Sequence, residues 1–463
     1  MESHWLIALD FMTIGSFLVF ATYLRSKIYF LQKYLIPNNI IAGLLLFIIG
    51  TLGIKFLQIP ADRYGKYIYH LFVITFIAMS LRKTEGGNSK TTYATGLLMS
   101  VNSGIQVVAG LLIAYIFMLT IEPNLFPTFG YYILLGFSQG PGQAYSIGHS
   151  WEPLGFENAA NIGLTFAALG YIWAITIGLL LIRFFKKRYK LKQQTIKNSD
   201  NEINETGVIK EIMDQPCAGE LTTDNSAIDG FTFQIALVLF VYLVTFLSLK
   251  GIEFILPIII NNTEIASQLI SILWGLHFIF GSLFAILIRK AMQRLSWGNI
   301  INNGLMTRIS GSSLDFMVTA AIAAISISIL LDYILIISVM SIVGGLLTLW
   351  FVVREIQKSN LDSPLERILA LFGTLTGTLS TGLTLTRVVD PDFKTKAAQD
   401  IVLGAGVAVP FILPFMASMI VPILGLDKGL LNQYYLINLA ALTIYTALLF
   451  IYWRYYSKKI TEK

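Results

Sequence analysis

Long apolar runs separated by short polar segments dominate this chain. Each run is roughly 20 residues long, which is the length of α-helix that crosses the hydrocarbon core of a bilayer. About 11 such runs lie at 5–24, 39–59, 66–81, 93–121, 159–183, 231–249, 265–288, 311–331, 333–353, 401–425 and 432–453. Regular alternation of apolar and polar residues is absent, which argues against a membrane β-barrel. The pattern predicts an all-α, polytopic membrane protein.

Composition supports the same fold class. Apolar residues make up 55% of the 463 residues, charged residues make up only 13%, and the mean hydropathy is +0.69. Soluble domains carry about 25% charged residues. No Lys or Arg precedes the first run, and no small-residue cleavage site accompanies it. The run is therefore predicted to be a transmembrane helix and not a signal peptide. A single cysteine, Cys217, excludes a multi-cysteine metal site.

Two further segments, 131–150 and 366–386, are too rich in Gly, Ser and Thr for ordinary lipid-facing helices. We expect both to be re-entrant, and we expect the N-terminus to be external. With that topology only five of the 33 Lys and Arg residues fall outside: Lys55, Arg63, Lys66, Lys250 and Lys428. Because cytoplasmic loops carry excess Lys and Arg, the count predicts a cytoplasmic central linker and C-terminus. The expected location is a bacterial inner (plasma) membrane.

A polar linker divides the chain into halves of matching organisation. Each half has four spans, one re-entrant segment and one further span, and the halves begin on opposite sides of the membrane. This is the pattern of inverted-topology repeats in secondary transporters. The predicted divisions are a first repeat at 1–189, the linker at 190–230, a second repeat at 231–426, and an extra span with a basic tail at 427–463.

The first re-entrant segment reads GFSQGPGQAYS and cannot sustain a regular helix, because it places Gly on both sides of Pro141. Broken backbone at membrane depth must be buried in protein or line a wet cavity. Free amides at a half-helix N-terminus can hold a carboxylate there. The predicted substrate-binding residues are Ser138, Gln139, Gly140, Gly142 and Gln143.

The second re-entrant segment, LFGTLTGTLSTGLTLTR, is rich in hydroxyl groups, which supply the oxygen ligands that hard cations prefer. Its predicted substrate residues are Thr378, Ser380, Thr381 and Arg387, and its predicted sodium ligands are Thr374, Thr376 and Gly377. Two alternatives stay open. Gly, Ser and Thr in both segments also permit close helix packing, and Arg387 also suits an ordinary cytoplasmic boundary.

Polar residues after the first re-entrant segment are further candidates. Asn158 and Asn161 begin the next helix, where an N-cap role competes with a role in binding substrate (Asn158) or sodium (Asn161). His149 and Glu152 are a candidate gate pair, against the alternative that His149 is simply packed or interfacial.

GFSQGPGQAYS followed by GFENAANIGLTFAALGY resembles the glycine-rich motif and following helix of the sodium/glutamate symporters. FLQKYLIPNNIIAGLLL resembles the loop and second helix of that family. The resemblance implies two inverted five-helix repeats with re-entrant loops, sodium-coupled glutamate uptake, and a homodimer that moves by an elevator mechanism. Asn158 matches an asparagine of the family motif, whereas Asn161 replaces an acidic residue there. Where the family has GGHGTG, residues 138–143 of this chain read SQGPGQ. The histidine of the family motif is lost, and a proline is gained.

These observations predict a secondary transporter and not an enzyme, since HExxH and paired intramembrane acids are absent from the sequence. The expected transport is sodium-coupled symport of glutamate or a related anionic amino acid or carboxylate. The expected partners are that anion, the lipid bilayer and a second copy of the chain, with Na⁺ as coupling ion, no organic cofactor and no nucleic acid. The alternatives are a 2-hydroxycarboxylate (citrate or malate) symporter and a membrane protein without transport activity.

Overall fold

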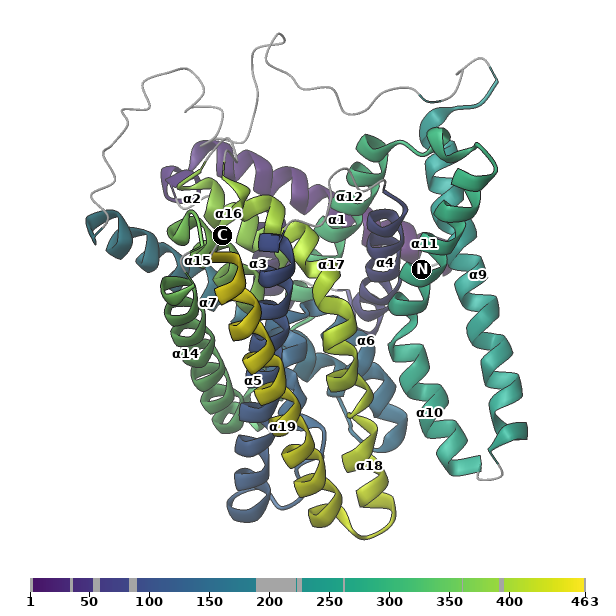
Figure 1. The fold of residues 1–463 in the computed structure, drawn as a ribbon. Coiled ribbons are helices and arrows are strands. Elements are labelled where there is room, and N and C mark those ends of the chain that lie inside the picture. Colours follow the sequence, from purple (N-terminus) through teal and green to yellow (C-terminus); the bar gives the residue numbers. More distant parts are fainter. Residues whose placement is uncertain are drawn as a thin grey trace. The chain divides into compact units, whose positions relative to one another are not determined.

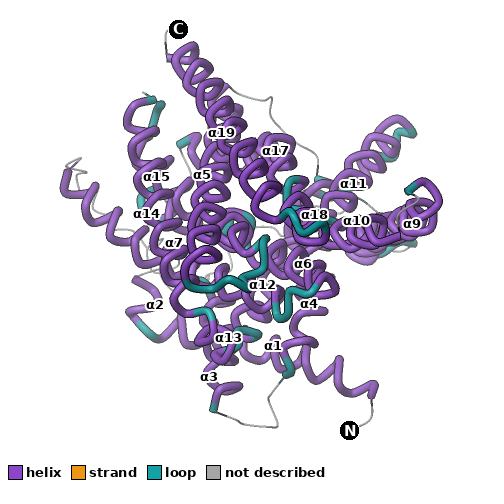
Figure 2. Tube along the Cα trace, turned by 90° about the horizontal axis from the view of Figure 1, so that it is seen from below, coloured by secondary structure: helices purple, strands orange, loops and turns teal. Residues whose placement is uncertain are grey.

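The computed structural model describes residues 3–33, 36–52, 59–82, 90–188, 222, 227–260, 263–359, 361–390 and 395–461. Every regular element within these ranges is helical (Figures 1 and 2). Most of the predicted linker, including Cys217, lies outside the described residues. The predicted all-α class is confirmed.

Eight helical stretches of the described chain are long and apolar enough to cross a membrane. They are α1 (Ser3–Lys27), α4 (Ala61–Leu81), α5 (Lys90–Thr120), α7 (Ala159–Arg188), α9 (Gly230–Ile259), α14 (Ile334–Lys358), α17 (Lys396–Ala417) continued by α18 (Ile420–Asp427), and α19 (Leu431–Thr461). A ninth is possible if α10 (Thr263–Gly275) and α11 (His277–Arg294), which meet at a 61° bend, cross as one broken span. The protein is therefore a multi-pass helical membrane protein.

Two of the 11 predicted spans are absent from this set. The run at 39–59 forms α3 (Asn38–Thr51), a helix of only 14 residues, and 53–58 lie outside the described part. The run at 311–331 is divided between α12 (Asn303–Ala323) and the short helix α13 (Ile327–Asp332). Helix α12 starts earlier than predicted because Asn302 caps it. The Asn302 side chain accepts a hydrogen bond from the backbone N–H of Leu305 at 3.0 Å. The early start brings Arg308 into α12, in addition to Asp315 of the predicted run, and lowers its apolarity.

The chain forms two compact units, each built from segments of both predicted halves. Unit 1 comprises residues 1–86, 145–161 and 199–325, and unit 2 comprises 87–144, 162–198 and 326–463. The units therefore do not follow the division at 190–230.

Unit 1 is held together by packing between α3, α4 and α12 and by a buried charge. The backbone of Gly43 in α3 lies against α12, since a Cβ built there would be 2.7 Å from Cβ of Ile322. Asp10 of α1 is buried and lies 3.2 Å from the Arg63 guanidinium of α4, while Tyr67 donates a 2.8 Å hydrogen bond to it. The acid is therefore paired, as buried charges must be.

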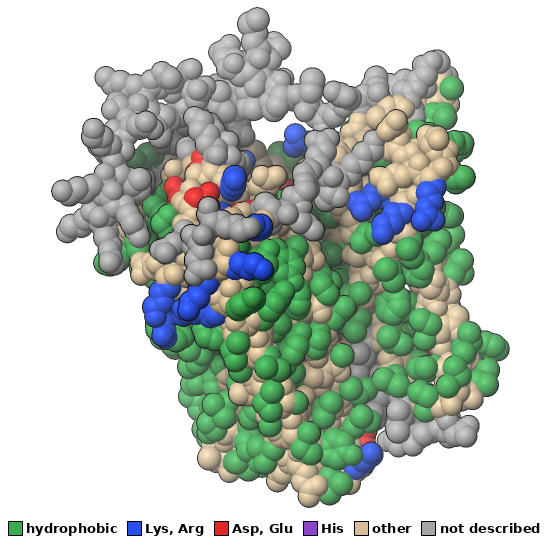
Figure 3. Space-filling model, in the orientation of Figure 1, with side chains coloured by type: hydrophobic (Ala, Val, Ile, Leu, Met, Phe, Trp, Pro, Cys, Tyr) green, Lys and Arg blue, Asp and Glu red, His purple; other side chains and the backbone are tan. Residues whose placement is uncertain are grey.

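Unit 2 is organised around α5, which packs against α17 and α19. Trp453 Nε1 of α19 donates to the Ala94 carbonyl at 3.0 Å, and Tyr435 Oη donates to the Leu111 carbonyl at 2.8 Å. These two bonds, at opposite ends of α5, make α19 antiparallel to it. The outer face of α19 is apolar and exposed at helical spacing, with Ile437, Ile444, Leu448 and Ile451 all about 60% accessible. Figure 3 shows hydrophobic side chains over much of the described surface in that view. A surface that faces lipid has to be apolar.

The described basic residues of unit 2 gather mainly at the end where α5 and α17 begin. The contacts of Arg367 with Asp400 and of Arg454 with Glu355 join several helix ends there. Lys90, Arg354, Lys358, Lys396 and Lys458 belong to the same helix ends. Lys428 follows α18, beyond the far end of α17. This one-sided distribution within unit 2 agrees with the asymmetry of Lys and Arg counted in the sequence.

Candidate functional site

The first Gly-rich segment is broken where the sequence predicts. A 3₁₀ turn, η1 (Phe129–Tyr131), leads into a π-helical turn, η2 (Leu134–Ser138). The backbone then passes through Gly140 at φ +83°, a left-handed conformation that glycine adopts without steric cost. Helix α6 (Pro141–Trp151) follows, with proline at its first position, where a missing N–H costs nothing.

The second Gly-rich segment is a helical hairpin. Helix α15 (Pro364–Thr376) ends at Gly377, Thr378 is extended, and α16 (Leu379–Arg387) runs back. The two arms touch at their glycines, because a Cβ built on Gly373 would lie 2.8 Å from Cα of Gly382. The segment at 366–386 is therefore two short helices and not one continuous helix.

The two breaks lie next to each other within unit 2. A Cβ built on Gly140 would lie 3.1 Å from Cγ2 of Thr378 and 3.8 Å from the Gly377 carbonyl oxygen. Gly170 of α7 lies beside both segments, since a Cβ there would clash with the Thr376 carbonyl oxygen and would be 3.0 Å from the Phe137 ring. The two breaks are therefore neighbours in the structure, although they are far apart in the sequence.

Gln106 of α5, which the sequence analysis did not single out, ties the two segments together. Its Nε2 donates to the Leu375 carbonyl in α15 at 2.9 Å and to Thr348 Oγ1 in α14 at 2.9 Å. Its Oε1 accepts a short hydrogen bond from Ser138 at the end of η2. Gln106 is only 1% exposed, so these bonds form in a dry environment and fix the breaks relative to α5.

Buried polar atoms without a described partner lie on the same elements. Asn102 is fully buried, and neither atom of its carboxamide has a hydrogen-bond partner among the described residues. It lies one turn before Gln106, on the same face of α5. Thr374 Oγ1 of α15 and Gln143 Oε1 of α6 are also buried without a described partner. Leaving such groups unpaired costs about 1–3 kcal/mol each, so the region is suited to polar ligands.

Two helix N-termini converge at the paired breaks. The first backbone bond of α6 runs from Ala144 N–H to the Gly140 carbonyl at 3.1 Å, and that of α16 from Gly382 N–H to the Thr378 carbonyl at 3.0 Å. The amides that precede these bonds have no acceptor inside their own helix. Both helices also present the positive ends of their dipoles. The arrangement favours an anion.

The opposite helix ends supply oxygen atoms. The helical turns that end at Ser138 and Thr376 present backbone carbonyls, and Ser138 and Thr374 add neutral side-chain oxygens. Asn102, one turn before Gln106 in α5, carries a further neutral oxygen. Neutral oxygens of this kind are the ligands that hard cations such as Na⁺ prefer. The residues present therefore fit a sodium ion by their donor chemistry.

A buried ion pair holds the base of the hairpin. Arg367 of α15 and Asp400 of α17 are each 2% exposed, and Arg367 Nη2 lies 2.8 Å from Asp400 Oδ2. Thr92 of α5 donates to the other carboxylate oxygen at 2.6 Å. Arg367 Nε also donates to the Asp362 carbonyl at 2.7 Å. The sequence analysis did not identify this pair, because its members are 33 residues apart and no local motif joins them.

The structure brings together most of the residues predicted from the two segments. Ser138, Gln139, Gly140, Gly142, Gln143, Thr374, Thr376, Gly377, Thr378 and Thr381 all lie at the breaks or within two turns of them in unit 2. Thr376 donates back to the Phe372 carbonyl at 2.7 Å, and the hydroxyls of Thr378 and Thr381 are 3.3 Å apart. The side chain of Ser380 lies outside the described part.

Three predicted residues are placed elsewhere. Arg387 is exposed at the far end of α16, about 13 Å along the helix axis from Thr378, a position that suits the boundary alternative. Asn158 and Asn161 belong to unit 1. Asn158 is exposed and has φ 59°, a left-handed conformation that asparagine tolerates, just before α7 begins at Ala159. This conformation differs from the extended one of an ordinary N-cap.

Comparison with models of protein families, with curated proteins and with solved structures finds no match. The function is therefore argued from the geometry of the paired breaks.

Proposed function

We propose that this protein is a secondary transporter that couples sodium to the uptake of glutamate or a related anionic amino acid or carboxylate across a bacterial inner membrane. One observation carries the proposal. In unit 2 of a multi-pass membrane protein, two broken helices present their N-termini at adjacent breaks, marked by the close approach of Gly140 to Thr378. Transporters with discontinuous helices bind anionic substrates in this way.

The anion would be bound mainly by backbone. Gly142 and Gln143 begin α6, and Ser380 and Thr381 begin α16, so their N–H groups precede the first intrahelical bonds. Gln139 and Thr378 are partly exposed beside them and add side-chain donors. Backbone amides and helix dipoles recognise a carboxylate without a charged side chain, which fits a segment that lacks Lys and Arg from 138 to 143.

Sodium would be held by backbone carbonyls at the C-terminal ends of the broken helices and by the Thr374 hydroxyl. Asn102 is a further proposed ligand, which was not predicted from the sequence. Its amide oxygen is fully buried and lacks a described partner. Binding of Na⁺ beside the anion would compensate the negative charge, which gives a physical reason for coupling the two.

The directions of the helices in unit 2 support inverted repeats. Helix α5 runs from the ion-pair end towards the breaks, and α7 runs the opposite way, as the contacts of Gly170 with Thr376 and of Gly178 with Leu385 indicate. In the other half, α14 runs towards the ion-pair end and α17 away from it, as the Arg454–Glu355 and Arg367–Asp400 pairs indicate. The helices before and after the break in one half thus run in the opposite directions to the corresponding helices of the other half.

The location of both breaks in one compact unit supports an elevator mechanism, in which unit 2 would carry the substrate and unit 1 would serve as the scaffold of a homodimer. The resemblance of GFSQGPGQAYS to the sodium/glutamate symporters adds the substrate class.

A 2-hydroxycarboxylate is the second candidate substrate. The residues of the breaks, 138–143 and 374–381, include no Asp or Glu that would pair with the ammonium group of an amino acid. Citrate or malate needs no such partner.

Thermal stabilisation of the purified protein by a panel of amino acids and carboxylates, with and without sodium, tests this proposal. A ligand present at 100 times its Kd stabilises the folded state by about 2.7 kcal/mol. We expect glutamate or a related anion to raise the Tm only when sodium is present. Equal stabilisation in sodium and in choline would contradict the coupling.

A further inference from the structure

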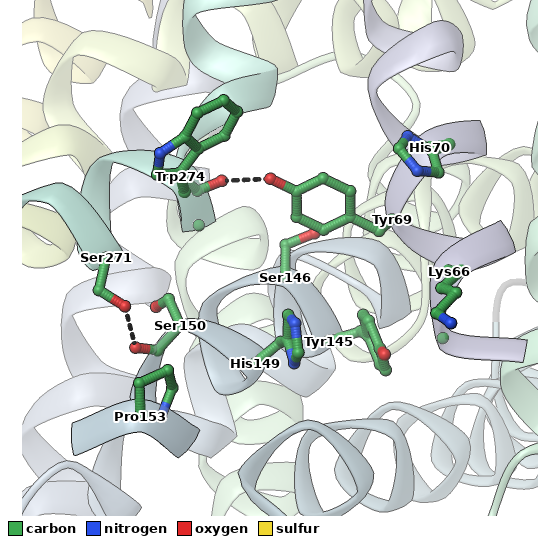
Figure 4. A pocket seen from close by; sticks show the side chains of 12 residues that line it. Lys66, Tyr69, His70, Tyr145, Ser146, His149, Ser150, Pro153, Ser271 and Trp274 are labelled. Atoms are coloured by element: carbon green, nitrogen blue, oxygen red, sulfur yellow. Dashed lines mark hydrogen bonds between the residues drawn. The ribbon is translucent and has the colours of Figure 1, made fainter. Parts of the chain in front are cut away.

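Unit 1 contains a cavity of about 340 Å³ between α4, α6 and α10 (Figure 4). This volume is within the range of small-molecule pockets. All the residues that line it belong to unit 1. The paired breaks of the transport proposal belong to unit 2, and none of their residues lines this cavity.

Hydrogen bonds between its three helices hold the cavity walls. Tyr69 Oη of α4 donates to the Trp274 carbonyl of α10 at 2.8 Å, and Ser271 Oγ of α10 donates to the Ser150 carbonyl of α6 at 2.6 Å. Both bonds are drawn in Figure 4. The cavity is therefore pre-formed, and a ligand would not have to order its walls.

The lining offers flat apolar surfaces. Tyr69, Tyr145 and Trp274 each contribute an aromatic ring, and Pro153 adds a further apolar face. Burial, more than the nearby Glu152 and Asp62 carboxylates, raises the pKa of the Tyr145 phenol, so the phenol is neutral at physiological pH. Aromatic walls of this kind pack against a planar ligand by stacking or edge contacts.

The charge of the lining is positive. Lys66 is the one residue with a permanent charge among those that line the cavity, and none of them is Asp or Glu. The nearest acid to Lys66 in the described chain is Asp62, at 4.0 Å, and both side chains are about 70% exposed, so this pair is weak and easily exchanged. Glu152 is engaged, because it lies 2.9 Å from His149 Nδ1 and 3.3 Å from the Ala160 N–H.

Ser146 adds an unused hydroxyl to the wall formed by α6. It is fully buried, and its Oγ has no hydrogen-bond partner among the described residues. Figure 4 shows the Ser146 side chain on the cavity wall, beside the Tyr69 ring. A buried hydroxyl without a partner pays a desolvation cost of about 1–3 kcal/mol, which a ligand oxygen that accepts its hydrogen bond would offset.

We propose that this cavity is a binding site for a small organic anion with a planar apolar body. The anionic group is bound by the Lys66 ammonium and the Ser146 hydroxyl, and the planar body packs against Tyr69, Tyr145 and Trp274.

Calorimetric titration of the full-length protein in detergent with benzoate, and with benzamide as its neutral isostere, tests the proposal. We expect benzoate to bind saturably, and benzamide to bind at least tenfold more weakly because it carries no charge for Lys66. Lys66→Gln should raise the Kd for benzoate about tenfold, as expected for loss of a charged hydrogen bond. Ser146→Ala should raise it about fivefold. Lys66 is exposed, and Ser146→Ala removes only one oxygen atom, so neither change should disturb the fold. The Tm without ligand checks that each variant is folded.

Lys428→Gln is the matched control, since Lys428 is an exposed lysine of unit 2. It should leave the benzoate Kd unchanged. Equal binding of benzoate and benzamide would overturn the proposal, as would unchanged affinity in both Lys66→Gln and Ser146→Ala, or no saturable binding of benzoate. A sodium-dependent Tm shift with glutamate that survives Lys66→Gln would leave the transport proposal standing when this one fails.

Discussion

The backbone of Gly140 lies against the side chain of Thr378, two residues that are 238 positions apart and belong to different halves of the chain. A Cβ on Gly140 would be 3.1 Å from Cγ2 of Thr378, and Gly140 has φ +83°. The left-handed conformation favours glycine, because a larger residue would be strained in it. A Cβ on Gly140 would also require the Thr378 side chain to shift by a few tenths of an ångström.

Gly140→Ala therefore tests whether the close approach of the breaks is needed for ligand binding. We expect a loss of about 1–2 kcal/mol in unfolding free energy from the left-handed backbone, and loss of the sodium-dependent Tm shift by the anionic ligand. Gly406→Ala is the control, since a Cβ there meets nothing within 4 Å and the residue is inside α17. Ligand stabilisation that survives in Gly140→Ala would show that the contact is not needed.

Gln106→Leu removes the carboxamide that joins η2, α14 and α15. The Leu375 carbonyl and the hydroxyls of Ser138 and Thr348 would lose a buried partner. We expect unfolding in detergent to become easier by about 1–3 kcal/mol, with weaker ligand stabilisation. Gln433→Leu changes an exposed glutamine of α19 and should have little effect. Equal stability of the two variants would show that Gln106 does not hold the breaks.

Arg367→Met breaks the buried pair with Asp400 and leaves that carboxylate uncompensated. Removing one partner of a buried ion pair costs about 3–5 kcal/mol, and thermal unfolding measures the loss. Asp62→Asn, at the exposed pair with Lys66, should cost less than about 1 kcal/mol. The double variant Arg367→Met/Asp400→Leu should be more stable than Arg367→Met alone. A double variant no more stable than Arg367→Met alone would contradict coupling of the two residues.

The distribution of basic residues predicts the orientation of unit 2. In a Cys217→Ser background, Lys428→Cys should react with a membrane-impermeant maleimide added outside intact cells. Lys396→Cys, at the start of α17, should react only after permeabilisation. The reverse labelling would mean that the chain is inserted with the opposite orientation.

Local chemistry explains which features were predictable. Gly140, Pro141 and Gly377 lie in segments that are dense in Gly, Ser and Thr, so both breaks were predictable from the residues themselves. A proline alone is a weaker signal, since α17 continues through Pro410 and Pro414. Gln106, Asn102 and the Arg367–Asp400 pair were not, because their roles depend on partners far away in the sequence. A weak signal was present in MSVNSGIQ, where Asn102 and Gln106 are one turn apart within an otherwise apolar span. Spacing alone could not show whether that face meets lipid or protein.

The bounds of one span differ from the prediction for a related reason. Hydropathy alone placed a helix at 311–331, whereas the Asn302 cap starts α12 at Asn303. Capping moved the boundary, as it often does when an Asn precedes a mixed polar and apolar run.

Uptake of labelled glutamate by proteoliposomes under an inward sodium gradient tests the central claim most directly. We expect accumulation that stops when sodium is equal on both sides, that persists in Gly406→Ala and that is lost in Gly140→Ala. Citrate, malate and aspartate, tested in the same way, separate the candidate substrates. Failure to accumulate glutamate, aspartate, citrate or malate under that gradient would contradict the account of this protein as a sodium-coupled transporter.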